Sequence, residues 1–150
     1  MINQILVAID GSSHSLKAVE YAAQIAAGCN AKMYILTVLR AHQSEKVTKE
    51  LQNYARLEHI EGADFEAMKV LSSELLSHAE DTARKSGVTK IKKSLESGPV
   101  ARTIVSVAKK NNADIIVIGS RGLGNIEATL RGGVSHRVEL LAKCSVLTVK

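Results

Sequence analysis

Two glycine-containing segments near the C-terminus carry the residues best suited to hold a ligand. Residues 119–122 read Gly-Ser-Arg-Gly, and after nine further residues 132–135 read Gly-Gly-Val-Ser. Glycine has no side chain, so its backbone can approach a ligand closely and adopt positive φ values. The second segment precedes a helix-like stretch, and free N–H groups at a helix start favour negative charge. Together the two segments predict a phosphate-binding loop.

Two familiar phosphate signatures do not fit this loop. A Walker A loop needs Lys followed by Ser or Thr after its second glycine, and the chain has no such pair there. The dinucleotide fingerprint needs a third glycine after Gly122 and Gly124, but Glu127 occupies that position. The loop also follows the fourth predicted strand instead of the first. A P-loop NTPase and a Rossmann dehydrogenase are therefore disfavoured.

Asp10 is the second candidate ligand residue, because a carboxylate at the end of an interior strand is placed where open α/β sheets bind ligands. The three residues Ser12, Ser13 and His14 follow it closely. One interpretation is a hydrolase site with carboxylate, hydroxyl and imidazole. The other is a strand-to-helix turn with capping serines. Closeness in sequence does not make a triad, and we favour the capping turn.

The pattern of apolar residues predicts five strands separated by helices. The strands are expected at residues 4–9, 33–39, 91–95, 113–118 and 145–150, with 91–95 at an edge because it is more polar and contains lysines. The first helix should end at Gly28 and the second at Gly87, and Pro99 should begin the third. Residues 41–60 are either a helical extension or a mobile flap over the site.

Helical spacing also predicts which residues each helix buries. The expected buried stripes are Ala18, Tyr21, Ala22, Ile25 and Ala26 in the first helix, Leu71, Leu75, Ala79 and Ala83 in the second, Val100, Ile104, Val107 and Ala108 in the third, and Val134, Val138 and Leu141 in the last.

Alternating strands and helices define the fold class. We expect a single α/β domain over residues 1–150, with an open, Rossmann-like, five-stranded parallel sheet in the order 3-2-1-4-5 and helices on both faces. In such sheets ligands bind beyond the carboxyl ends of the strands, where the winding direction switches. Asp10 and Gly119 both follow strand ends of this kind.

Composition narrows the functional classes. The chain has 150 residues, 45% of them hydrophobic, but its apolar runs are too short to span a membrane, so a cytoplasmic protein is expected. The net charge is +5, but one Phe, three Tyr and no Trp leave little surface for stacking bases, which disfavours nucleic acid. Cys29 and Cys144 are interpreted as buried thiols, and the five histidines show no metal-binding spacing.

Four blocks of the sequence resemble the universal stress proteins, and together they cover nearly the whole chain. They are ILVAIDGSSHS at the start, GPVARTIV, ADIIVIGSRGLG, and the ending GGVSHRVELLAKCSVLTVK. The ATP-binding branch of that family carries G-x2-G-x9-G-S/T, whose glycine spacing Gly119, Gly122 and Gly132 match. Gly133 occupies the Ser/Thr position. A lost hydrogen bond to a charged group costs about 1.5–3 kcal/mol, or about one to two decades of affinity.

The resemblance implies an adenine nucleotide, ATP (or ADP or AMP) with Mg²⁺, as ligand. It places Asp10 and Val38 near the nucleoside, and the glycines near ribose and phosphates. The implied nucleotide-binding residues are Ala8, Ile9, Asp10, Val38, Gly119, Arg121, Gly122, Gly132, Gly133, Val134 and Ser135. No residue pair offers an activated nucleophile or a matched acid and base, so at most slow ATP hydrolysis is expected.

The last strand, Ser145–Lys150, is predicted to pair with a second copy of the chain, because an edge strand can form a two-fold symmetric interface. A nucleotide-dependent regulator in the stress response is the leading functional hypothesis. Two alternatives stay open: a dimeric interaction module whose glycine loop is empty, and a slow nucleotide hydrolase.

Overall fold

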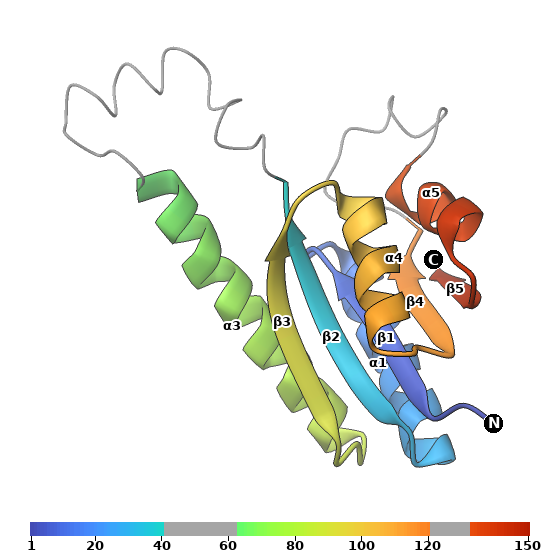
Figure 1. Ribbon diagram of the computed structural model, residues 1–150. Helices are drawn as coiled ribbons and strands as arrows, with labels where there is room; N and C mark the ends of the chain where they lie inside the picture. Colours follow the sequence, from blue (N-terminus) through green and yellow to red (C-terminus); the bar gives the residue numbers. More distant parts are fainter. Residues whose placement is uncertain (41–62, 121–132) are drawn as a thin grey trace, which may run out of the picture.

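A computed structural model describes residues 1–40, 63–120 and 133–150 (Figure 1). Its five parallel strands form one sheet in the order β3-β2-β1-β4-β5, which confirms the predicted order. The strands are β1 (Gln4–Ile9), β2 (Lys32–Leu39), β3 (Ile91–Ser97), β4 (Ile115–Gly119) and β5 (Ser145–Val149). The lysine-bearing β3 lies at one edge, as expected, and β5 lies at the other.

Helices cover both faces of the sheet, as the alternation predicts. On one face lie α1 (Ser13–Cys29) and α3 (Ala63–Lys85), which pack against each other. On the other face lie α4 (Val100–Lys110) and α5 (Val134–Leu141), which also form a contacting pair (Figure 1). The carboxyl ends of all five strands therefore meet at one edge of the sheet, and their amino ends meet at the opposite edge.

The core has two layers because successive side chains of a strand point to opposite faces. Ile5, Val7 and Ile9 of β1 pack with α1 and α3, whereas Leu6 and Ala8 pack with α4 and α5. A central parallel strand is thus buried on both sides and needs an unbroken apolar run. This is why residues 4–9 could be identified as a strand from sequence.

The predicted end of the first helix is wrong. α1 continues past Gly28 to Cys29, and Asn30 adopts the left-handed conformation with φ 53°. Its backbone N–H donates to the carbonyls of Ala26 and Ala27. Asparagine tolerates this conformation better than most residues, so it ends the helix in glycine's place. Gly87 does have positive φ, 92°, just after α3.

The stripes of buried helix residues were only partly predicted. Tyr21 is 46% exposed, Leu71 59% and Leu141 48%, so none of the three belongs to the core. In α1 the small residues Ala18, Ala22 and Ala26 are buried as predicted, with Val19 and Ala23 beside them. The wide alanine-rich face lets α1 lie close to the sheet, and the bulky Tyr21 falls outside it.

Three smaller expectations also need correction. Cys29 is exposed, so the interpretation of both cysteines as buried thiols fails there, whereas burial does raise the pKa of the half-buried Cys144. Pro99 is the N-cap of α4, which begins at Val100. β4 begins at Ile115 instead of Ala113, because the Ala113 N–H donates to the Ala108 carbonyl at the end of α4.

Residues 41–60, for which a helix or a flap was expected, lie outside the described residues. Among the residues that the structure describes, no helix is both long and apolar enough to cross a membrane.

Candidate functional site

The turn between β1 and α1 forms the first part of the candidate site. Asp10 is exposed, and its Oδ1 accepts a hydrogen bond from the Ser12 N–H at 3.0 Å. Gly11 between them has φ 86°, which favours glycine. Ser12 is the N-cap of α1, and its Oγ accepts from the Ser15 N–H at 3.3 Å. The capping interpretation is therefore confirmed for Ser12, and Asp10 helps to shape the turn.

The end of β4 lies directly against the start of α1. A Cβ built on Gly119 would lie 2.8 Å from both the His14 carbonyl carbon and the Ser15 nitrogen. Next to it, the Ser120 Oγ and the His14 Nδ1 are 2.8 Å apart, within hydrogen-bond distance. Glycine is required at 119 because the helix backbone occupies the space of a side chain. The predicted reason, approach to a ligand, is not needed to explain this glycine.

The N-terminus of α5 is the third part. Gly133 is its N-cap, and no side chain caps the helix. The Ser135 Oγ lies 3.5 Å from the Ser120 carbonyl, a long hydrogen bond that links α5 to the end of β4. The first N–H groups of a helix have no partner within it and carry partial positive charge. This helix start therefore offers donors for an anion.

Strand register brings several predicted residues to one level. Ile9 of β1 pairs with Thr37 of β2, so Val38 lies level with Asp10. Ala8 pairs with Ile118 of β4, so Ser120 also lies at that level. Main-chain groups that follow three adjacent strands, β2, β1 and β4, thus lie at the same level at the carboxyl edge of the sheet.

The other predicted residues differ in what they can offer a ligand. The side chains of Ala8 and Ile9 are 6% and 4% exposed and belong to the core, so they are not available to a ligand. Val38, Val134 and Ser135 are half-buried. Arg121, Gly122 and Gly132 lie outside the described residues.

Sequence reasoning missed Thr37, at the end of β2. Its side chain is 4% exposed, and its Oγ1 has no hydrogen-bond partner. A hydroxyl in a strand of otherwise apolar residues was the available signal, but threonine is common in strands for its shape alone. The hydroxyl lies one residue before Val38 and is therefore close to the level of the site.

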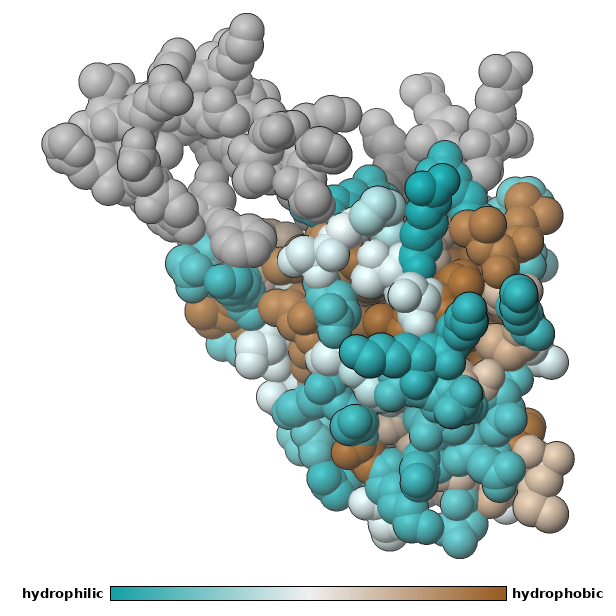
Figure 2. Space-filling model, in the orientation of Figure 1, coloured by the Kyte–Doolittle hydropathy of each residue, from teal (hydrophilic) through white to brown (hydrophobic). Residues whose placement is uncertain are grey.

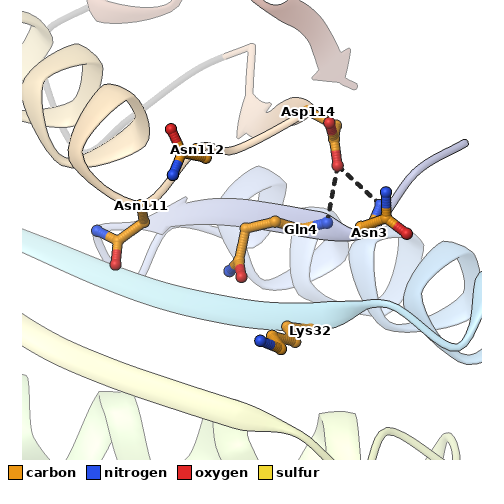
Figure 3. Close-up of a pocket in the computed structure, with 6 residues that line it drawn as sticks. All are labelled: Asn3, Gln4, Lys32, Asn111, Asn112 and Asp114. Carbon is orange, nitrogen blue, oxygen red and sulfur yellow. Dashed lines mark hydrogen bonds between the residues drawn. The ribbon is translucent and has the colours of Figure 1, made fainter.

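A hollow within the described residues lies elsewhere, at the amino ends of the strands (Figure 3). It has a volume of about 380 Å³ and is lined by Asn3, Gln4, Lys32, Asn111, Asn112 and Asp114. The Asp114 Oδ2 accepts from the backbone N–H groups of Asn3 at 2.7 Å and Gln4 at 2.9 Å. These hydrogen bonds lower the pKa of Asp114. No predicted site residue lines this hollow.

Metal-binding side chains do not gather at the candidate site. Across the described ranges, His, Cys, Asp and Glu form no group of three or more that would hold an ion.

The fold and the site define a class: an open parallel sheet whose carboxyl edge presents main-chain donors from two strand-to-helix connections. The sequence profile of the Universal stress protein family matches residues 1–150, and the chain belongs to this family. It is 33% identical to Universal stress protein YxiE of Bacillus subtilis, with 100% of both chains covered. It is 31% identical to Universal stress protein Rv1636 of Mycobacterium tuberculosis, with 97% of this chain and 94% of the relative covered.

Solved structures agree with this assignment. One of them is a crystal structure of a universal stress protein in complex with cAMP, whose sequence is 30% identical to this chain. The match covers 99% of this chain and 96% of that chain, with a TM-score of 0.70. The structure of hypothetical protein MJ0577 has a TM-score of 0.79 at 21% identity, covering 100% and 96% of the two chains. The second likeness concerns the fold alone.

Proposed function

We propose that this protein binds an adenine nucleotide at the carboxyl edge of its sheet, between Asp10, Val38, Ser120 and the N-terminus of α5. The observation that carries the proposal is the uncapped start of α5 beside the end of β4, where Ser135 and Ser120 meet. The relative solved with cAMP supports an adenine nucleotide as the ligand class. ATP with Mg²⁺ is the specific ligand that we propose.

The proposed contacts are mostly main-chain contacts. Val38, level with Asp10, offers backbone groups to the adenine edge. The N–H groups of Gly133, Val134 and Ser135 face the phosphates, with the Ser135 hydroxyl beside them. Backbone groups of Ala8, Ile9 and Gly119 line the base of the site, and Arg121, Gly122 and Gly132 complete the loop in this proposal.

Mg²⁺ fits this arrangement if the nucleotide supplies most of its oxygen ligands. Magnesium in nucleotide sites usually keeps several waters and takes one or two carboxylates plus phosphate oxygens. Asp10 is the exposed carboxylate at the right strand end. We propose that it contacts the ion or the ribose while its Oδ1 continues to hold the turn through Ser12.

We propose binding and regulation, with hydrolysis slow at most. Nucleotide binding can change which partners the protein binds only if the nucleotide binds one conformation of the protein more tightly than another. α5 links the site to the protein surface, because its first turn faces the ligand and its last residues Leu140 and Leu141 are exposed, 71% and 48%. Figure 2 shows hydrophobic residues gathered over α5.

The partner surface that we propose is a two-fold interface formed by the edge strand β5, Ser145–Lys150, together with this apolar end of α5. Leu140→Glu should weaken a dimer in sedimentation, because it places a charge in the interface. Leu71→Glu is the matched control, since Leu71 is similarly exposed, 59%, but lies on α3 across the sheet. Equal dissociation of both variants, or a monomeric wild type, would contradict this interface.

The first test of nucleotide binding is a mass spectrum of ligand released by denaturing freshly purified protein. Calorimetry then compares ATP, ADP, AMP and cAMP, each with and without Mg²⁺. The proposal expects an adenine nucleotide in the spectrum or saturable heat with at least one of them. No ligand and no heat, with dimerisation intact, would favour the interaction module with an empty loop.

Two variants test the site itself. Asp10→Ala and Gly132→Val should each abolish nucleotide binding while the domain stays folded. Asp81→Ala is the control, because Asp81 is an exposed carboxylate on α3, away from the site. Thermal unfolding of each variant verifies folding, and titration curves unchanged from wild type for both would contradict the proposed site.

A further inference from the structure

Three lysines meet at the amino ends of β2 and β3, on the sheet face that α4 covers. Gln4 pairs with Lys32, and Tyr34 pairs with Lys92, so these side chains share the face of the apolar core under α4. Lys90 precedes β3, and its carbonyl accepts a hydrogen bond from the Met33 N–H at 2.9 Å. Lys90 thus lies beside Lys32.

These lysines line a second hollow that adjoins the one in Figure 3. It has a volume of about 360 Å³, and Gln4, Lys32 and Asn111 line both hollows. Figure 3 shows these three side chains around one space below the end of α4. Lys90, Lys92 and Tyr34 extend the lining toward the edge strand. Three ammonium groups and two side-chain amides therefore share one groove.

Within the described structure this groove carries an excess of positive charge, with three lysines in its lining and one carboxylate, Asp114, in the adjoining hollow. The side-chain ammonium groups of Lys32, Lys90 and Lys92 form no ion pair or hydrogen bond with other described residues. By contrast, Lys93, on the opposite face of the same strand, lies 2.7 Å from a Glu80 carboxylate oxygen and 3.2 Å from the Ser77 hydroxyl. Like charges on neighbouring strands repel each other, and a bound anion would remove that repulsion.

The neighbouring carboxylate and the neighbouring helix end offset only part of this charge, because Asp114 supplies one negative charge against three lysines. The Asp114 side chain accepts hydrogen bonds from the backbone of Asn3 and Gln4. The C-terminus of α4 carries partial negative charge, but the Val107 carbonyl is bonded by both the backbone and the side-chain nitrogen of Asn111, at 3.0 and 2.8 Å. Two further lysines, Lys109 and Lys110, lie in that last turn.

The spacing of the lysines suits a ligand with several anionic groups. Neighbouring strands lie about 4.8 Å apart, and alternate residues of a strand about 6.6 Å. The three lysine stems thus begin within about 8 Å of one another, so their flexible side chains can reach one small molecule. The hollows have the size of a small-molecule site and lack the extended apolar surface that a protein partner would need.

We propose that this groove is a second binding site, which takes a small polyanion bearing two or more phosphate or carboxylate groups. The site is independent of the proposed nucleotide site, because it lies at the opposite edge of the sheet. The polyanion can therefore bind at the amino edge whether or not a nucleotide is bound at the carboxyl edge.

The test follows backbone amide NMR signals of the full chain during separate titrations with tripolyphosphate and with citrate. The proposal expects saturable shifts at Gln4, Lys32, Ile91, Lys92 and Asn111 with at least one of the two anions. Tripolyphosphate alone would assign phosphate groups as the ligand chemistry, and citrate alone would assign carboxylates.

A charge-matched pair of variants tests whether the lysines of the groove carry the binding. Lys32→Gln/Lys90→Gln/Lys92→Gln should weaken binding by at least about tenfold, because each ammonium contact to an anion is charge-assisted. Lys17→Gln/Lys85→Gln/Lys143→Gln removes the same charge from exposed positions outside the groove and should leave the dissociation constant within about twofold.

Three results would overturn the proposal. The first is equal weakening by the two triple variants, which would show general charge attraction. The second is a set of shifts confined to Ser12, Gly119 and Ser135 at the other edge. The third is a response to a poly-glutamate peptide but to neither small anion, which would make the groove a protein-docking surface.

Discussion

The two edges of the sheet are built from different kinds of chemical group. At the carboxyl edge, the candidate site is made mainly of backbone: a glycine turn after Asp10, the close contact at Gly119 and the uncapped helix start at Gly133. At the amino edge, the groove is made of side chains from Gln4, Lys32 and their neighbours (Figure 3). A backbone site depends on exact chain geometry, whereas a side-chain site depends on which strands lie next to each other.

This difference predicts how each edge responds to mutation. At the carboxyl edge a single added methyl group should disrupt packing, because two backbone segments are in contact. At the amino edge, removal of a charge should change ligand affinity with little effect on the fold, because long side chains at the surface contribute little to stability. The predictions below run from the largest expected effect to the smallest.

Gly119→Ala should cause the largest loss of stability, about 3 kcal/mol, because its Cβ would lie 2.8 Å from backbone atoms of His14 and Ser15. Backbone cannot give way as a flexible side chain can. Urea unfolding measures the loss. Gly133→Ala is the matched control: its Cβ meets no atom within 4 Å, and its φ is −54°, so a change within about 0.5 kcal/mol is expected. Equal losses would contradict close packing at Gly119.

Gly133→Ser should tighten nucleotide binding by about one to two decades, because it adds a hydroxyl donor to a phosphate. The space for this side chain is present, since a Cβ at Gly133 has no neighbour within 4 Å. Calorimetry with Mg-ATP measures the change. Gly133→Ala separates the hydroxyl from the added carbon. Tightening by alanine as well as by serine would show that the hydroxyl is not the cause.

Thr37→Val should raise the free energy of unfolding by about 1 kcal/mol, because it removes a buried hydroxyl that lacks a partner. Thr37→Ser is the control that keeps the hydroxyl and should not stabilise. Denaturant midpoints of the three proteins report the effect. A loss of stability in Thr37→Val would indicate that the hydroxyl is satisfied in solution, by water for instance.

Asp114→Ala should cost less than about 1 kcal/mol at neutral pH, because its hydrogen bonds to Asn3 and Gln4 are exposed to water. The pKa of Asp114 is lowered in the folded chain, so its contribution is present above the unfolded value of about 3.9. It should disappear as the pH falls through the lowered folded value.

Unfolding of Asp114→Ala and wild type at a series of pH values tests this dependence. The two curves should converge in acid and separate above about pH 4. A difference that is constant from acid to neutral pH would rule out the carboxylate as its cause.

The turn after β1 at the carboxyl edge was predictable from sequence because backbone chemistry leaves local signals. Glycine pairs, a strand-ending Asp10 and capping Ser12 are all readable from neighbouring positions. The reason for Gly119 was not, since contact with His14 and Ser15 arises between segments far apart in the chain. Asn30 ends the first helix in place of Gly28, because both residue types can adopt the left-handed conformation and the sequence alone does not say which one does.

The amino edge was not predictable from local patterns. Lys90 and Lys92 look like part of a solvated run with Lys93, and Lys32 is distant in the sequence. Only the register of β2 against β3 brings Lys32 beside Lys90, and strand alternation sends Lys93 to the other face, where Glu80 holds it. Tertiary pairing therefore decides which of several similar lysines share a groove.

The most direct test of the account is a titration of the full chain with Mg-ATP, followed through its backbone amide NMR signals. If the carboxyl edge binds the nucleotide, the largest saturable shifts should occur at Ser12, Val38, Ser120, Val134 and Ser135. Saturable shifts confined to Lys32, Ile91 and Lys92, or no saturable shift at any amide, would contradict a nucleotide site at that edge.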